Sequence, residues 1–176
     1  MTIARPTLVS QVADAIDELI VDEGLRPGAL LPAVSELAAR FGVNRLVVRE
    51  AMRAVEARGL IVARQGKRAM VVALHAAPLM DFFALAVRRD PDTVLELLEV
   101  RRAIEVHIAS LAATRIEHVD PALLADMEQS VATMRSAEAG SVEFVEADVH
   151  FHEVLAHAAD NRLLRFLVEG LGEALR

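Results

Sequence analysis

Four arginines lie close together in the segment GVNRLVVREAMRAVEARGLI, residues 42–61, beside only two acidic residues. They are Arg45, Arg49, Arg53 and Arg58. In a helix, Arg45 and Arg49 share one face because they are four residues apart, and that face is opposite to Val48 and Met52. A guanidinium group can bond both O6 and N7 of guanine, which is worth about 1–3 kcal/mol of discrimination between bases. The segment therefore has the chemistry of a surface that recognises DNA, and the alternative is a basic face that is only solvated.

The charge of the chain is unevenly distributed, although its net charge is −7. Residues 1–77 carry 10 basic and 8 acidic side chains, whereas residues 78–176 carry 9 basic and 18 acidic ones. Residues 40–68 alone have 8 basic and 2 acidic side chains. This asymmetry indicates that the first part of the chain meets a polyanion and that the second part has another task.

A second set of side chains lies in EFVEADVHFHEVLAHAADNRLL, where Asp148 and His152 are four residues apart. A carboxylate and an imidazole at that spacing lie on one helical face and could share a divalent cation. The alternative is a histidine that only forms a hydrogen bond in a helical bundle. Arg101 and Glu105 also share a face, and without other information they form an ordinary helical ion pair of about 0.3–0.5 kcal/mol.

The composition of the 176 residues favours helices, since the apolar fraction is 54% and the aromatic fraction only 3%. The absence of cysteine excludes disulfides and thiolate metal sites. No run of eighteen apolar residues lacks charges, so we expect no membrane partner and no transmembrane helix. The polar N-terminal residues are not typical of a signal peptide. We therefore expect a cytoplasmic protein.

The elements that would position the arginines are three short helices and a hairpin. Apolar spacing predicts helices over residues 8–21, 34–41 and 45–58, with Asn44 as the N-cap of the third. Two β-rich runs within residues 60–73 flank Gln65-Gly66-Lys67-Arg68, which predicts a hairpin. Two helices joined by a short glycine turn form a helix-turn-helix, and a hairpin after it completes a winged helix-turn-helix. We assign residues 1–74 to this domain.

Residues 79–176 are expected to form an antiparallel α-helical bundle, so the fold class is mainly α. Asp90-Pro91 and Asp120-Pro121 each place a carboxylate before a proline, which predicts an N-cap followed by position N1 of a helix. Ser141 and Asn161 are expected to cap the two helices that follow.

The N-terminal part resembles the DNA-binding domain of GntR-family bacterial transcription regulators. The resemblance covers LRPGALLPAVSELAARFGVNRLVVREAMRAVEARGLI, and the matching residues are Pro27, Gly28, Leu31, Pro32, Leu37, Ala38, Gly42, Val43, Arg45, Val48, Arg49, Glu50 and Ala51. Together with the helix and hairpin positions, it leads us to expect DNA contacts from Ser35, Asn44, Arg45, Leu46, Arg49, Gln65, Gly66, Lys67 and Arg68. Ser35 stands near the position where the family often has arginine, and the wing has Arg68-Ala69 where glycine-threonine is common. The operator sequence is therefore not transferable.

The C-terminal part is similar to the FCD-type effector domain of one GntR subgroup. The shared pattern is carried by Asp148, Phe151, His152, Leu155, Ala158, Asn161 and Leu164. The resemblance implies that Asp148 and His152 bind a metal ion, zinc or nickel, with two histidines from later helices. It also implies that Arg101, with Glu105 on the same face, binds a small carboxylate effector. That domain has six or seven helices and this chain about four, so we expect it to be incomplete relative to the family.

These features predict a ligand-responsive transcription regulator that binds a palindromic operator on double-stranded DNA as a homodimer. A metal-dependent enzyme is the first alternative, but no nucleophile–base pair or phosphate loop accompanies Asp148 and His152, so no catalytic residue is assigned. The second alternative is a structural DNA-binding protein that has no effector.

Overall fold

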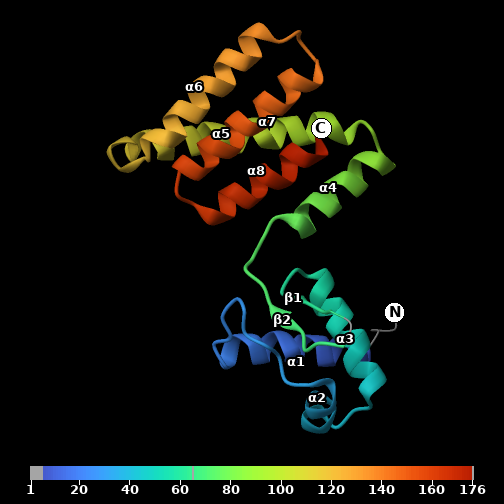
Figure 1. Cartoon of the computed structure of the whole chain (residues 1–176). Helices are drawn as coiled ribbons and strands as arrows, with labels where there is room; N and C mark the ends of the chain where they lie inside the picture. The colour runs from blue at the N-terminus through green and yellow to red at the C-terminus, as the bar shows by residue number, and fades with distance from the viewer. Residues whose placement is uncertain (1–5, 65, 176) are drawn as a thin grey trace. The chain divides into compact units, whose positions relative to one another are not determined.

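The computed structural model describes residues 6–64 and 66–175, and this part of the chain is mainly α-helical, as predicted. Contacts divide the chain into two units, with the division between Pro78 and Leu79. The elements of the first unit are α1 (Leu8–Asp22), α2 (Val34–Phe41), α3 (Arg45–Ala57), β1 (Ile61–Val62) and β2 (Met70–Val71) (Figure 1). Those of the second are α4 (Ala77–Arg89, which begins just before the division), α5 (Thr93–Thr114), a 3-10 turn (Ile116–His118), α6 (Pro121–Ser136), α7 (Val142–Ala158) and α8 (Arg162–Ala174).

The first unit is a winged helix-turn-helix, in which α3 packs against both α1 and α2. Its core contains the fully buried side chains Ile16, Leu31, Leu37, Val48 and Val55. Full burial of such a side chain stabilises the fold by about 1.5–3 kcal/mol. The core therefore fixes the position of α3 from three directions: α1, α2 and the loop before α2.

The turn between α2 and α3 depends on Gly42, which has a φ of +65°. This left-handed conformation ends α2, and the Val43 N–H then bonds the Ala38 carbonyl at 3.0 Å. Asn44 caps α3 as predicted, because its Oδ1 accepts a hydrogen bond of 2.9 Å from the Val47 N–H. This three-residue turn sets the direction of α3 relative to α2.

The hairpin is short, and its strands pair antiparallel with Ile61 opposite Val71 and Val62 opposite Met70. The loop before α2 joins its edge through an isolated bridge between Leu30 and Met70. Gln65, predicted at the tip, lies outside the described residues.

The second unit is a helical bundle in which α7 packs against α5, α6 and α8. Consecutive helices α6 and α7 lie side by side and run in opposite directions (Figure 1). Ile108, Ala156 and Val168 belong to the core between α5, α7 and α8. Small residues allow close approach here, since a Cβ at Gly172 would lie 3.1 Å from Cγ1 of Val149.

Three of the four predicted helix starts in the bundle are confirmed, and one is wrong. Asp120, Ser141 and Asn161 accept hydrogen bonds from the first turns of α6, α7 and α8. Asp90 does not cap α5, which begins at Thr93 after a turn. In that turn the Thr93 N–H bonds the Asp90 carbonyl at 3.1 Å, and Asp90 Oδ1 accepts from the Asp92 N–H at 3.1 Å. The Asp90 carboxylate thus stabilises the turn and does not cap α5.

Candidate functional site

The exposed face of α3 is a direct consequence of how the opposite face is buried. Val48, Ala51, Met52 and Val55 recur at helical spacing and enter the core of the first unit. Arg45, Leu46 and Arg49 are then left on the surface, with Leu46 62% exposed. In general, an exposed leucine at a helix N-terminus can contact thymine methyl groups, and arginines beside it can bond guanine.

The arginines of residues 42–61 have different surroundings. The ion pairs within the described part of the chain involve neither Arg45 nor Arg49. Arg58, in contrast, pairs with Asp17 and with Asp14 at 3.0 Å, both on α1. Hydrogen bonds to Asp17, which has the larger effect, and to Asp14 raise the pKa of the Arg58 guanidinium above its ordinary value. Arg58 therefore links α3 to α1, whereas the first two arginines point to solvent.

In the loop between the strands, Gly66 and Lys67 are exposed, as predicted for the tip of the hairpin. Gly66 has a φ of +72°, and the Lys67 N–H bonds the Arg64 carbonyl at 3.0 Å, which forms a tight turn. Arg68 behaves differently, because its Nε donates a hydrogen bond of 2.6 Å to the Leu31 carbonyl. It ties the hairpin to the loop before α2.

Ser35 lies exposed in the first turn of α2, and it does not cap the N-terminus of this helix. The Glu36 carboxylate accepts a hydrogen bond of 2.8 Å from the Ala33 N–H. The Ser35 hydroxyl is therefore not used as a cap, and it lies near a helix N-terminus, where a phosphate is favoured.

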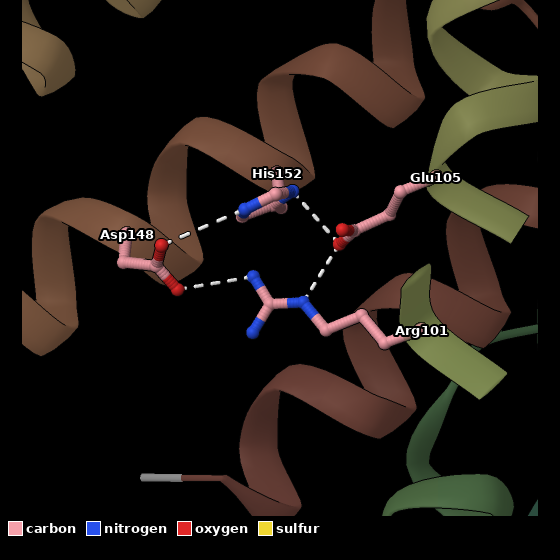
Figure 2. A network of polar contacts seen from close by, with 4 residues as sticks. All are labelled: Arg101, Glu105, Asp148 and His152. Carbon is pink, nitrogen blue, oxygen red and sulfur yellow. Dashed lines mark hydrogen bonds and ion pairs between the residues drawn. The ribbon is translucent and has the colours of Figure 1, made fainter. Parts of the chain in front are cut away.

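In the second unit, four charged or titratable side chains from α5 and α7 form one network (Figure 2). Arg101 donates from Nε to Glu105 at 2.7 Å and from Nη2 to Oδ2 of Asp148 at 3.1 Å. His152 places Nδ1 2.7 Å from Glu105, although too obliquely for a straight hydrogen bond, and Nε2 3.6 Å from Oδ1 of Asp148. Helical spacing predicted each of the two pairs but not the contacts that join them.

Burial and charge act in opposite directions on Glu105. Burial raises the pKa of its carboxyl group, but the contacts with His152 and Arg101 outweigh burial and leave this pKa below its ordinary value. Glu105 is therefore ionised at neutral pH. The network borders an open depression of about 350 Å³ that is also lined by Leu98, Arg102 and Val106.

Two side chains of the network, Asp148 and His152, have donor atoms that suit one divalent cation. His152 Nε2 and Asp148 Oδ1 face each other, and their separation of 3.6 Å is close to that of two ligands bound to one zinc ion, each about 2.0–2.2 Å from it. The Glu105 carboxylate lies at Nδ1, on the side of the ring where a carboxylate orients the histidine in many known metal sites. Among residues 6–64 and 66–175, no group of three or more histidine, aspartate or glutamate side chains is placed to hold a metal ion.

Comparison with known proteins identifies both units. Residues 8–71 match the bacterial regulatory proteins of the gntR family, and residues 96–176 match the FCD domain. The chain belongs to the GntR family, in the group that carries an FCD domain.

Two relatives show how far the similarity extends. LutR, an HTH-type transcriptional regulator of Bacillus subtilis (strain 168), is 33% identical over 157 residues, which are 89% of this chain and 70% of LutR. The Glc operon transcriptional activator of Escherichia coli (strain K12) is 28% identical over 177 residues, which are 97% of this chain and 68% of that protein. A solved structure of a Streptococcus agalactiae GntR protein superposes with a TM-score of 0.62 at 30% identity, over 94% of this chain and 80% of that one.

The protein is thus a DNA-binding transcription regulator, and its class acts as dimers that respond to small molecules. None of the described helices is both long enough and apolar enough to cross a membrane.

Proposed function

We propose that Asn44, Arg45, Leu46 and Arg49 recognise bases of a palindromic operator, each protomer of a homodimer binding one half-site. The observation that carries this proposal is the division of α3 into a buried apolar face and an exposed face with two arginines outside the ion pairs of the described chain. Ser35, Gly66, Lys67 and Arg68, together with Gln65, are proposed to contact the backbone or the minor groove.

The proposal is tested by gel shift with the DNA upstream of the protein's own gene. Arg45→Ala and Arg49→Ala are each expected to weaken specific binding about 5- to 150-fold per half-site, which corresponds to the loss of one bidentate base contact in each protomer. Arg135→Ala, which removes an exposed arginine from α6, is the control with the same change of charge. Specific binding that survives both α3 substitutions at wild-type strength would refute the assignment.

We further propose that the second unit binds a small carboxylic acid beside Arg101 and Glu105. A guanidinium group suits a carboxylate because it can bond both oxygens, and Arg101 and Arg102 both line the depression. The ligand changes the affinity for DNA only if it binds one arrangement of the dimer more tightly than another. A panel of small acids in a thermal-shift assay tests this, because a ligand that binds the folded state raises the melting temperature.

Asp148 and His152 are proposed as two ligands of a divalent cation, zinc or nickel. When bound, the cation would supply a Lewis-acidic centre for oxygen ligands. The residues of this chain would orient the two ligands: the Glu105 carboxylate lies 2.7 Å from Nδ1 of His152, and Arg101 bonds Oδ2 of Asp148. Loss of zinc binding in His152→Ala, measured by calorimetry, is the expected result.

A metal-dependent enzyme is disfavoured, because the relatives are named as transcription regulators. Both carboxylates near His152 are also engaged by Arg101, which leaves neither as an evident general base. The proposed site of action is the cytoplasm, where bacterial operators lie.

A further inference from the structure

The hairpin of the first unit has an apolar outer face in addition to the inner face that enters the core. Ile61 and Val71 point inward and are 2% and 4% exposed. Successive residues of a strand point to opposite sides, so their neighbours Val62 and Met70 lie on the outer face, opposite each other. Leu30, which bridges to Met70 from the loop before α2, is 51% exposed on the same face. Three apolar side chains therefore lie next to one another outside the core.

These three side chains line a depression of about 340 Å³, together with three cations: Arg64, Lys67 and Arg68. This volume is within the range of small-molecule sites, about 300–1,000 Å³. A stable protein partner would need about 800 Å² on each side, which so few apolar side chains do not supply. The depression therefore fits a small molecule better than it fits a protein surface.

The positive charge beside the depression is not neutralised by carboxylates. Arg68 is held by neutral groups, because its Nε donates to the Leu31 carbonyl at 2.6 Å and its Nη2 lies 3.5 Å from the Leu30 carbonyl. Within residues 6–64 and 66–175, the ion pairs of arginine and lysine include none of the three cations. Arg64 and Lys67 belong to one tight turn, in which the Lys67 N–H bonds the Arg64 carbonyl at 3.0 Å. Paired cations beside an apolar surface favour a ligand with an acid group and a hydrocarbon chain.

We propose that the outer face of the hairpin binds an aliphatic carboxylate. Its hydrocarbon chain packs on Leu30, Val62 and Met70, and its acid group bonds Arg64 and Lys67. This site lies in the first unit and is separate from the effector site proposed in the second unit. Because Lys67 is also proposed to contact DNA, the carboxylate competes with the operator, a consequence that rests on the proposed function.

Binding is measured in the full chain by NMR of ¹³C-methyl methionine, with octanoate as the probe. The Met70 signal, assigned with Met70→Leu, is expected to shift to saturation, since among the described methionines only Met70 lines the depression. Butyrate has the same charge and a shorter chain. It should bind about tenfold more weakly or less, because each buried methylene contributes about fourfold in affinity. Octylammonium, which has the long chain and the opposite charge, should give no saturable shift.

Two substitutions separate the apolar and the charged part of the site. Leu30→Gln should weaken octanoate binding about tenfold or more, because it removes apolar surface beside the chain. Leu8→Gln is the matched control in the same unit, since Leu8 is 52% exposed, and its affinity should stay within about twofold of the wild type. Arg64→Gln, at an exposed position, should also weaken binding about tenfold because a charged hydrogen bond is lost. Circular dichroism checks that all three variants keep their helices.

Competition with DNA is measured by gel shift with the operator duplex. Octanoate should release the duplex from the wild type and from Leu8→Gln, but not from Leu30→Gln at the same concentration. Octanoate binding at Met70 without release of DNA would overturn the competition alone. The α3 substitutions test operator recognition separately, so a failure there is distinguishable from a failure of this site.

The site itself is overturned by any of three results. The first is a Met70 signal that octanoate does not shift. The second is equal binding of octanoate and octylammonium, since the cations would then have no role. The third is a Met70 signal that shifts with the operator duplex and not with octanoate, which would make the outer face of the hairpin a DNA contact.

Discussion

The arginines of this chain differ in what surrounds their guanidinium groups. Arg45 and Arg49 lie exposed on α3, Arg58 binds Asp14 and Asp17, and Arg101 is buried between two carboxylates. Helical spacing correctly predicted which of them lie opposite the core face. It could not predict the partners of Arg58 or the second partner of Arg101, because Asp14 and Asp148 lie 44 and 47 residues away along the chain.

The Arg58 cluster makes a prediction about stability rather than DNA recognition. Arg58→Ala should lower the free energy of unfolding by about 1 kcal/mol, because two partly exposed ion pairs to α1 are lost and each is worth about 0.2–1 kcal/mol. Urea denaturation in low and high salt checks this, since screening should reduce the effect. Arg53→Ala, an exposed position on the same helix, is the control and should change stability by less than about 0.5 kcal/mol.

At the level of elements, the sequence predicted most helix starts because N-caps are local. Asn44, Asp120, Ser141 and Asn161 all accept the expected backbone hydrogen bonds. The prediction for Asp90 was wrong although this residue also precedes a proline. The chain makes a turn before α5, and the Asp90 carboxylate accepts a hydrogen bond within that turn. Local capping chemistry therefore limits where a helix can begin, and tertiary packing selects among the options.

The Ser141 cap leads to a prediction for the helix that carries Asp148 and His152. Ser141→Ala removes the acceptor for the Phe144 N–H, 3.1 Å away, and should destabilise the second unit by about 1 kcal/mol. Thermal and urea unfolding followed by circular dichroism measure the loss. Ser136→Ala, at the C-terminal end of α6, should cost clearly less because its hydroxyl only bonds carbonyls of its own helix. Equal losses at the two positions would contradict the capping role.

At the level of the whole molecule, charge is divided between the two parts of the chain. Residues 1–77 have a net charge of +2 and residues 78–176 a net charge of −9. The acidic part repels DNA at long range, so encounter depends on the cations of the first unit. The sequence alone predicted this division, because charge can be counted without knowledge of the fold.

The salt dependence of operator binding measures these contacts. Lys67→Ala should reduce the slope of log affinity against log salt concentration by about 1 per protomer, because one phosphate contact is lost. The base preference should stay unchanged, since a lysine on phosphate positions the protein without reading sequence. Arg135→Ala again serves as the control. An unchanged slope for Lys67→Ala would place the wing tip away from DNA.

Arg68 has one further consequence for how the first unit meets DNA. Its hydrogen bond to the Leu31 carbonyl fastens the hairpin to the segment that leads into α2. The hairpin is thereby held beside that segment before any duplex arrives. Less conformational freedom remains to be lost on association, and more of the contact energy appears as affinity.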